Sequence, residues 1–159
     1  MSEITRIIDQ LEREHEGDPW HGTPLVALLD GITAEQATRK PIAAGHSIWE
    51  LVLHVTGWKT EIARRVGGAP AGEPPEGDWP AVGDPTPGRW AEARQRLDDA
   101  QRTLIAAVRS LPEPRLFEPT NDPRNRPLGT GVSYYELLHG AVQHDVYHSG
   151  QIAALKYAL

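Results

Sequence analysis

Two histidines near the end of the chain, His144 and His148, stand four residues apart in the run HDVYHSGQI. Four residues make about one helical turn, so both imidazoles leave the same face of a helix. A third histidine, His54, lies far upstream in HSIWELVLHVTGW, which also has a helical pattern. Imidazole binds zinc, nickel, iron and copper, so these residues predict a site in which three histidines hold a divalent metal ion.

The rings need apolar helix faces to carry them into a core. His54 falls at the margin of the apolar stripe of a helix predicted to start at Ser47 and to end before Gly67. His144 and His148 fall inside the apolar stripe of a helix predicted to start at Ser133. We expect the buried face of that helix to comprise Leu137, Ala141, His144, His148, Ile152 and Leu155. The three rings are therefore expected between two facing helices, where bundle proteins commonly build metal sites.

Capping patterns mark where these helices begin. Ser47 with Glu50, and Ser133 with Glu136, match the capping box, in which each side chain satisfies a free backbone N–H. Two further major helices are predicted over residues 4–15 and 87–111. A shorter helical turn is expected with Thr23 as its N-cap and Pro24 at its first position, and another is expected after residue 33. In the 87–111 segment an apolar residue recurs every seven positions, at Trp90, Leu97, Leu104 and Leu111.

These segments predict an all-α fold, a helical bundle that forms one domain over residues 1–159. Strand signals are weak throughout. Two connections, residues 68–84 and 113–130, are rich in proline and glycine, and loops of this length usually carry function.

Composition excludes several function classes. The net charge of −6 and the lack of a basic stripe argue against a nucleic-acid partner. No segment is long and apolar enough to span a membrane, and the amphipathic N-terminus is unlike a signal peptide, so we expect a cytoplasmic protein. The chain has no cysteine, so any metal must be held by imidazole or oxygen, and any reacting thiol must come from a small molecule.

Other residues compete for roles near the metal. His21 is the first alternative to His54 as third ligand, and it is also a candidate catalytic group. Gln151, three residues after His148, can hydrogen-bond a metal-bound water or cap a buried network. Trp58, one turn after His54, is a core residue or the wall of a cofactor-binding pocket.

Three further residues are expected to be peripheral. Asp145 reads as a surface charge, His15 as a residue at the solvent edge of the first helix, and Glu50 as a cap. Because HDVYH lacks the glutamate of HExxH, the built-in general base of a zinc protease is missing, and peptide hydrolysis is disfavoured.

The combination of HSIWELVLHVTGW, a long proline-rich connection and HDVYHSGQI resembles the DinB/YfiT-like superfamily of four-helix metal-binding proteins. The run WHG, followed by a leucine-rich turn, resembles one subgroup. The resemblance implies an up-down-down-up four-helix bundle, often a homodimer, with His54, His144 and His148 on a divalent metal. Zinc or nickel is then expected first and iron next.

The resemblance also implies three possible functions. Characterised members of the family include transferases and an isomerase that use a low-molecular-weight thiol such as bacillithiol or mycothiol. A metal-dependent thiol S-transferase acting on a small-molecule electrophile is therefore the first hypothesis. A metal-dependent hydrolase is the second, and a non-catalytic metal-binding protein of the stress response is the third.

Overall fold

The computed structural model describes residues 1–123 and 132–159, and every regular element in these ranges is a helix. The elements are, in chain order, α1 (Glu3–His15), α2 (Leu25–Leu28), α3 (Ala34–Thr38), α4 (Ile48–Val66), α5 (Pro87–Ser110), the 3-10 helix η1 (Glu113–Phe117) and α7 (Tyr134–Tyr157). The only strand-like pairing among the described residues is an isolated bridge between Pro119 and Ser133. The predicted all-α class is confirmed.

The helices begin where side chains satisfy their free N–H groups. Ser47 caps α4 and Ser133 caps α7, each in a complete capping box, as predicted. Thr33 forms a third capping box at α3, and Thr86 caps α5 before Pro87 at the first turn. One expectation was wrong: α2 starts after Pro24 without any side-chain cap, so Thr23 is not its N-cap.

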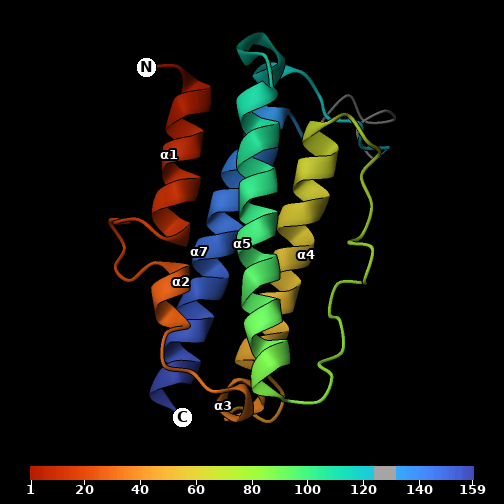
Figure 1. Ribbon diagram of the computed structural model, residues 1–159. Coiled ribbons are helices and arrows are strands. Elements are labelled where there is room, and N and C mark those ends of the chain that lie inside the picture. The colour runs from red at the N-terminus through yellow and green to blue at the C-terminus, as the bar shows by residue number, and fades with distance from the viewer. Residues whose placement is uncertain (124–131) are drawn as a thin grey trace.

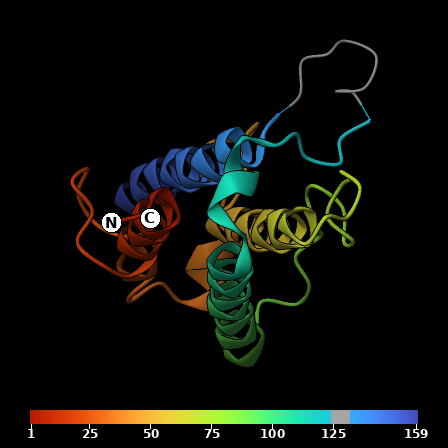
Figure 2. The same cartoon turned by 90° about the horizontal axis from the view of Figure 1, so that it is seen from above.

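The four long helices α1, α4, α5 and α7 lie side by side along one axis (Figure 1). In that view α1 and α7 run downward, whereas α4 and α5 both run upward. Because α4 and α5 are parallel, the chain must return along the whole length of the bundle between them, through residues 67–86. Seen from above, the four helices surround a common centre (Figure 2). Within this arrangement α4 packs against both α5 and α7.

The core divides into two apolar clusters at opposite ends of the bundle. One gathers side chains from α2, α3 and the adjoining ends of α4, α5 and α7, and the other gathers side chains from α1, η1 and the opposite ends of the same helices. Buried polar residues lie between the clusters; we call them the polar layer: Glu14, His15, Lys59, Gln101, Asp145 and Ser149. The three predicted metal ligands lie at the same level of the bundle.

The two long connections contain contacts or structure of their own. The segment between α4 and α5 packs against α4 at Gly57. There the Pro74 side chain comes so close that a Cβ added to Gly57 would lie 3.1 Å from it. The predicted loop over residues 113–130 begins with η1, and its residues 124–130 lie outside the described part of the chain. Among the described residues, no helix is long and apolar enough to cross a membrane.

Candidate metal centre

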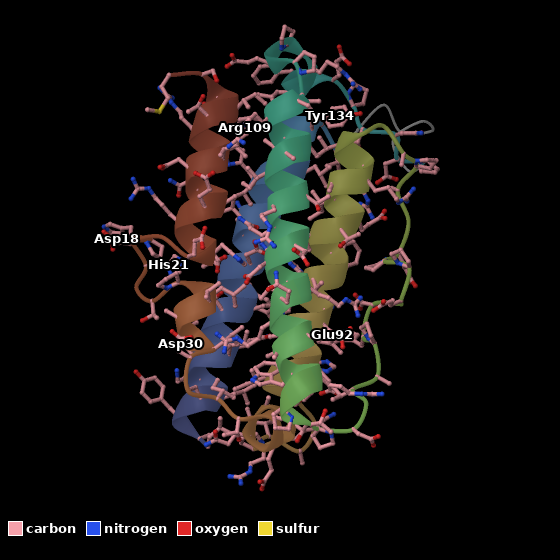
Figure 3. All side chains as sticks on the ribbon, viewed as in Figure 1. Asp18, His21, Asp30, Glu92, Arg109 and Tyr134 are labelled. Carbon is pink, nitrogen blue, oxygen red and sulfur yellow. The ribbon has the colours of Figure 1, made fainter. Side chains whose placement is uncertain are left out.

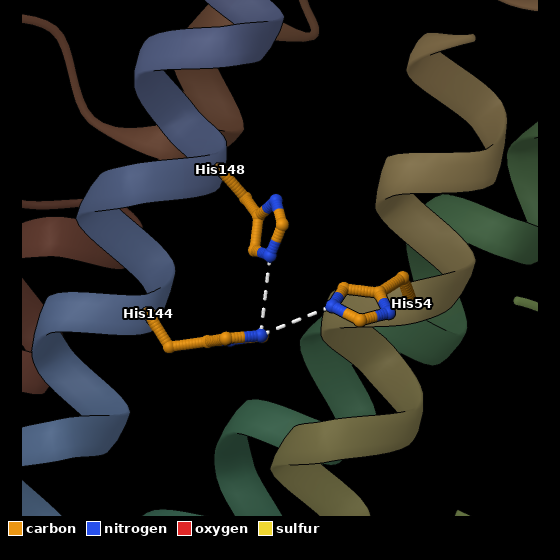
Figure 4. A group of neighbouring side chains, drawn as sticks. All are labelled: His54, His144 and His148. Carbon is orange, nitrogen blue, oxygen red and sulfur yellow. Dashed lines mark hydrogen bonds between the residues drawn. The ribbon is translucent and has the colours of Figure 1, made fainter. Parts of the chain in front are cut away.

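The three predicted ligand histidines meet between α4 and α7 (Figure 4). The Nε2 atom of His144 lies 3.0 Å from Nε2 of His54 and 3.2 Å from Nε2 of His148. One ligand atom from each ring lies within 4.8 Å of the others, which makes this trio the one candidate metal cluster in the described ranges. The prediction that residues 90 positions apart converge is therefore confirmed, and His21 does not take the place of His54.

Hydrogen bonds to the other ring nitrogens set the tautomers. Nδ1–H of His54 donates to the backbone carbonyl of Asp78 at 2.7 Å, and Nδ1–H of His148 donates to Oε1 of Gln151 at 2.8 Å. With their protons on Nδ1, both rings present unprotonated Nε2 atoms toward His144. Only Nε2 of His144 can then carry a proton between the rings, and a single N–H cannot donate to both His54 and His148. A cation bound to all three Nε2 atoms would satisfy these lone pairs together.

Burial keeps two of the rings neutral, as metal binding requires. Desolvation lowers the pKa of His148 to about 4, although the hydrogen bond to Gln151 opposes the change. Desolvation also lowers the pKa of His54, against the opposing effect of the Asp78 carbonyl. Because both folded-state values lie below the ordinary value, the two rings are unprotonated at neutral pH and ready to bind an ion. His144 is the most exposed ligand, with 28% of its side chain accessible, and marks the open side of the site.

The connection between α4 and α5 contacts His54 through Nδ1, the ring nitrogen that does not face His144. Besides the carbonyl contact, the Asp78 carboxylate lies 3.3 Å from Nδ1 of His54 and accepts a 2.7 Å hydrogen bond from the indole N–H of Trp58. Trp79 stacks on the His54 ring at 4.0 Å between centroids, and His46 stacks on the other face of Trp79 at 3.4 Å. Sequence reasoning missed Asp78 and Trp79, because an irregular segment has no periodicity that would place its side chains.

A buried ion pair joins the two ligand helices directly beneath the site. Lys59 of α4 binds Asp145 of α7, and the Lys59 ammonium also donates a 2.7 Å hydrogen bond to Gln101 of α5. Lys59 is 1% exposed and Asp145 is 2% exposed. Burial opposes ionisation of Asp145, but the positive charge of Lys59 and the hydrogen bonds from His144 and Lys59 outweigh it and hold the pKa of Asp145 below the usual range. The expectation that Asp145 is a surface charge was therefore wrong.

The remainder of the polar layer extends toward α1. Ser149, next to His148, donates a hydrogen bond to Glu14, and desolvation together with the charge of Asp145 raises the pKa of Glu14 to about 7. His15 is 3% exposed and its Nε2 lies 3.0 Å from Asp98 of α5. The expectation of a solvent-edge His15 was wrong, because the helix turns that residue toward α5 instead of outward.

The other sequence candidates lie at different distances from the ligands. Gln151 contacts His148, and the Trp58 ring lies 6.3 Å from the His54 ring and 6.2 Å from the His144 ring. Glu50 acts as a cap, and Lys40 also binds it. His21 is exposed and lies on the connection between α1 and α2, where it lines a pocket with residues of α7 other than the three ligands.

These three histidines could hold one first-row transition metal as neutral imidazoles, and three protein ligands would leave a coordination position for a water or a substrate. A family model described as the DinB superfamily matches residues 20–152 of the chain, which include all three histidines. No curated protein and no solved structure was found to match.

Proposed function

The chain belongs to the DinB superfamily, and on that premise we propose that it is a metal-dependent transferase built on an up-down-down-up four-helix bundle. It joins a low-molecular-weight thiol to a small electrophile. His54, His144 and His148 hold the metal. The observation that carries this proposal is the convergence of three Nε2 atoms. Those of His54 and His148 are unprotonated, because the Nδ1 atom of each ring carries the proton and donates a hydrogen bond.

The metal would supply Lewis acidity, which lowers the pKa of a thiol at the open position. The protein supplies the geometry. Asp78 orients His54 and Gln151 orients His148, so the ligand rings are fixed before an ion or a thiol arrives. Because the chain has no cysteine, no internal thiol competes for the open position.

A pocket beside the triad is the proposed place for the substrate. It has a volume of about 550 Å³, and Trp58 forms a wall shared with the metal site. Arg65 and the Gly72 backbone also line it, and the Arg65 guanidinium lies 5.5 Å from the centre of the Trp58 ring. An indole face beside polar groups suits a small molecule with one flat or apolar part.

A non-catalytic metal-binding protein is the second candidate, because the same triad connects α4 to α7 and a bound ion would cross-link them. We rank a hydrolase lower. The nearest buried carboxylate, Asp145, is bound to Lys59 and therefore is a poor general base for a metal-bound water.

The experiment mixes metal-loaded protein with bacillithiol, mycothiol or glutathione and a chromogenic electrophile such as 1-chloro-2,4-dinitrobenzene. We expect one thiol to react faster with the wild type than with the His144→Ala variant. His139→Ala, a change in the same helix outside the triad, is the control and should react like the wild type. No acceleration with any thiol, together with a metal-dependent rise in melting temperature, would favour the non-catalytic candidate.

A further inference from the structure

The side of α7 that faces away from α4 helps to form a second pocket, of about 670 Å³. Its other wall is α2 with the connection that precedes it, and Figure 3 shows His21 on that connection, on the side of the molecule away from α4. The lining residues are His21, Thr23, Ala27, Leu28, Val146, Ser149, Gly150, Ala153, Lys156 and Tyr157. None of the three metal ligands is among them.

The lining combines an apolar floor with a rim of hydrogen-bond donors. Ala27, Leu28, Val146 and Ala153 offer aliphatic surface, and the backbone of Gly150 leaves room above them. His21, Thr23, Lys156 and Tyr157 bring an imidazole, a hydroxyl, an ammonium and a phenol. Among the residues that the structure describes, no Asp or Glu side chain belongs to the lining, although the chain has a net charge of −6.

The ammonium of Lys156 is fixed in place. It donates hydrogen bonds to the backbone carbonyls of Leu28 at 2.8 Å and of Asp30 at 2.9 Å. An ammonium has three N–H donors, so two hold the group at the end of α2 and a third can serve a ligand. A cation held in this way, beside apolar surface, attracts a ligand that carries one negative charge on an apolar body.

We propose that this pocket binds a small organic anion with an aliphatic or aromatic body, a monocarboxylate being the simplest. The carboxylate contacts Lys156 and His21, and the apolar body lies against Val146 and Ala153. This assignment gives His21 a role in a site separate from the metal centre, and it stands independently of the proposed transferase function.

Gly150 offers a direct test. A Cβ built at this position meets no atom within 4 Å, so a leucine side chain would project into open space and occupy the pocket. Gly140 lies in the same helix and is equally open, but it does not line the pocket, which makes Gly140→Leu the matched control. Octanoate is the probe, 1-octanol is its uncharged analogue, and calorimetry measures binding to the full chain.

We expect Gly150→Leu to weaken octanoate binding at least about tenfold and Gly140→Leu to leave it unchanged, with both variants folded by circular dichroism. His21→Ala should weaken binding by a smaller factor, and octanol should bind about tenfold more weakly than octanoate. His144→Ala should bind octanoate like the wild type, which excludes coordination of the carboxylate at the metal. Equal binding by wild type and Gly150→Leu, or equal binding of octanol and octanoate, would overturn the proposal.

Discussion

Removing the ammonium of Lys59 should destabilise the fold far more than a surface lysine substitution. Lys59→Met keeps the aliphatic stem, but it leaves the Asp145 carboxylate buried without its cation and Gln101 without a donor. Both members of the pair are at most 2% exposed. Breaking a buried pair in this way costs about 3–5 kcal/mol, because the remaining charge loses its partner and cannot reach water.

The assay is urea denaturation of metal-free protein at pH 7, followed by circular dichroism. Lys40→Met is the matched control, because Lys40 also binds a carboxylate, that of Glu50, but its side chain is 44% exposed. Exposed pairs contribute at most about 1 kcal/mol, so this variant should unfold close to the wild type. The double variant Lys59→Met/Asp145→Leu should recover much of the lost stability, since it leaves no buried charge.

The effect should also depend on pH with a definite sign. In the wild type Lys59 helps to hold the pKa of Asp145 below its usual value. The pair therefore stabilises the fold at pH values above the pKa of Asp145 in the unfolded chain, and this contribution is lost as the pH falls through the lower pKa of the folded protein. In Lys59→Met burial instead raises the pKa of Asp145, and the cost of the substitution should shrink as the solution is acidified. A cost below about 1 kcal/mol at pH 7, or no coupling in the double variant, would refute the reasoning.

Three further predictions concern the metal and the polar layer. Gln151→Ala removes the acceptor for Nδ1–H of His148 and should weaken metal binding about 10- to 100-fold in a chelator competition, while its secondary structure stays that of the wild type. Asp78→Ala removes the carboxylate beside His54 but keeps the backbone carbonyl, so it should weaken metal binding by a smaller factor than Gln151→Ala does. Equal metal affinities of the two variants would contradict this order. Glu14→Gln should stabilise the protein by about 2–3 kcal/mol more at pH 8 than at pH 5. The folded protein binds the Glu14 proton more tightly than the unfolded chain does, so the wild type loses free energy of unfolding as pH rises from about 4.5 through 7. Melting curves of the two proteins that show no such pH dependence would contradict this prediction.

The ligand triad and the starts of α4 and α7 could be predicted from the sequence because they depend on local regularities. A capping box such as Ser47 with Glu50 is complete within four residues, and the spacing of His144 and His148 fixes their common face. The pairing of that face with His54 needed only the expectation that two amphipathic helices pack through their apolar stripes.

The polar layer could not be predicted in the same way. Hydropathy treats Lys59 and Asp145 as solvent-facing, since a charge is buried only when its partner is brought to it by tertiary packing. The same limit applies to His15, whose partner Asp98 lies in another helix. Asp78 and Trp79 belong to an irregular connection, so only the close approach of that segment to α4 reveals their contacts with His54.

The measurement that tests the central claim most directly is elemental analysis of the purified protein, with the His144→Ala variant prepared in parallel. Three converging imidazoles predict about one transition-metal ion per wild-type chain and strong depletion in the variant. A wild-type protein that retains no ion after incubation with zinc, nickel or iron, or a variant that retains as much as the wild type, would contradict the assignment of these histidines as a metal centre.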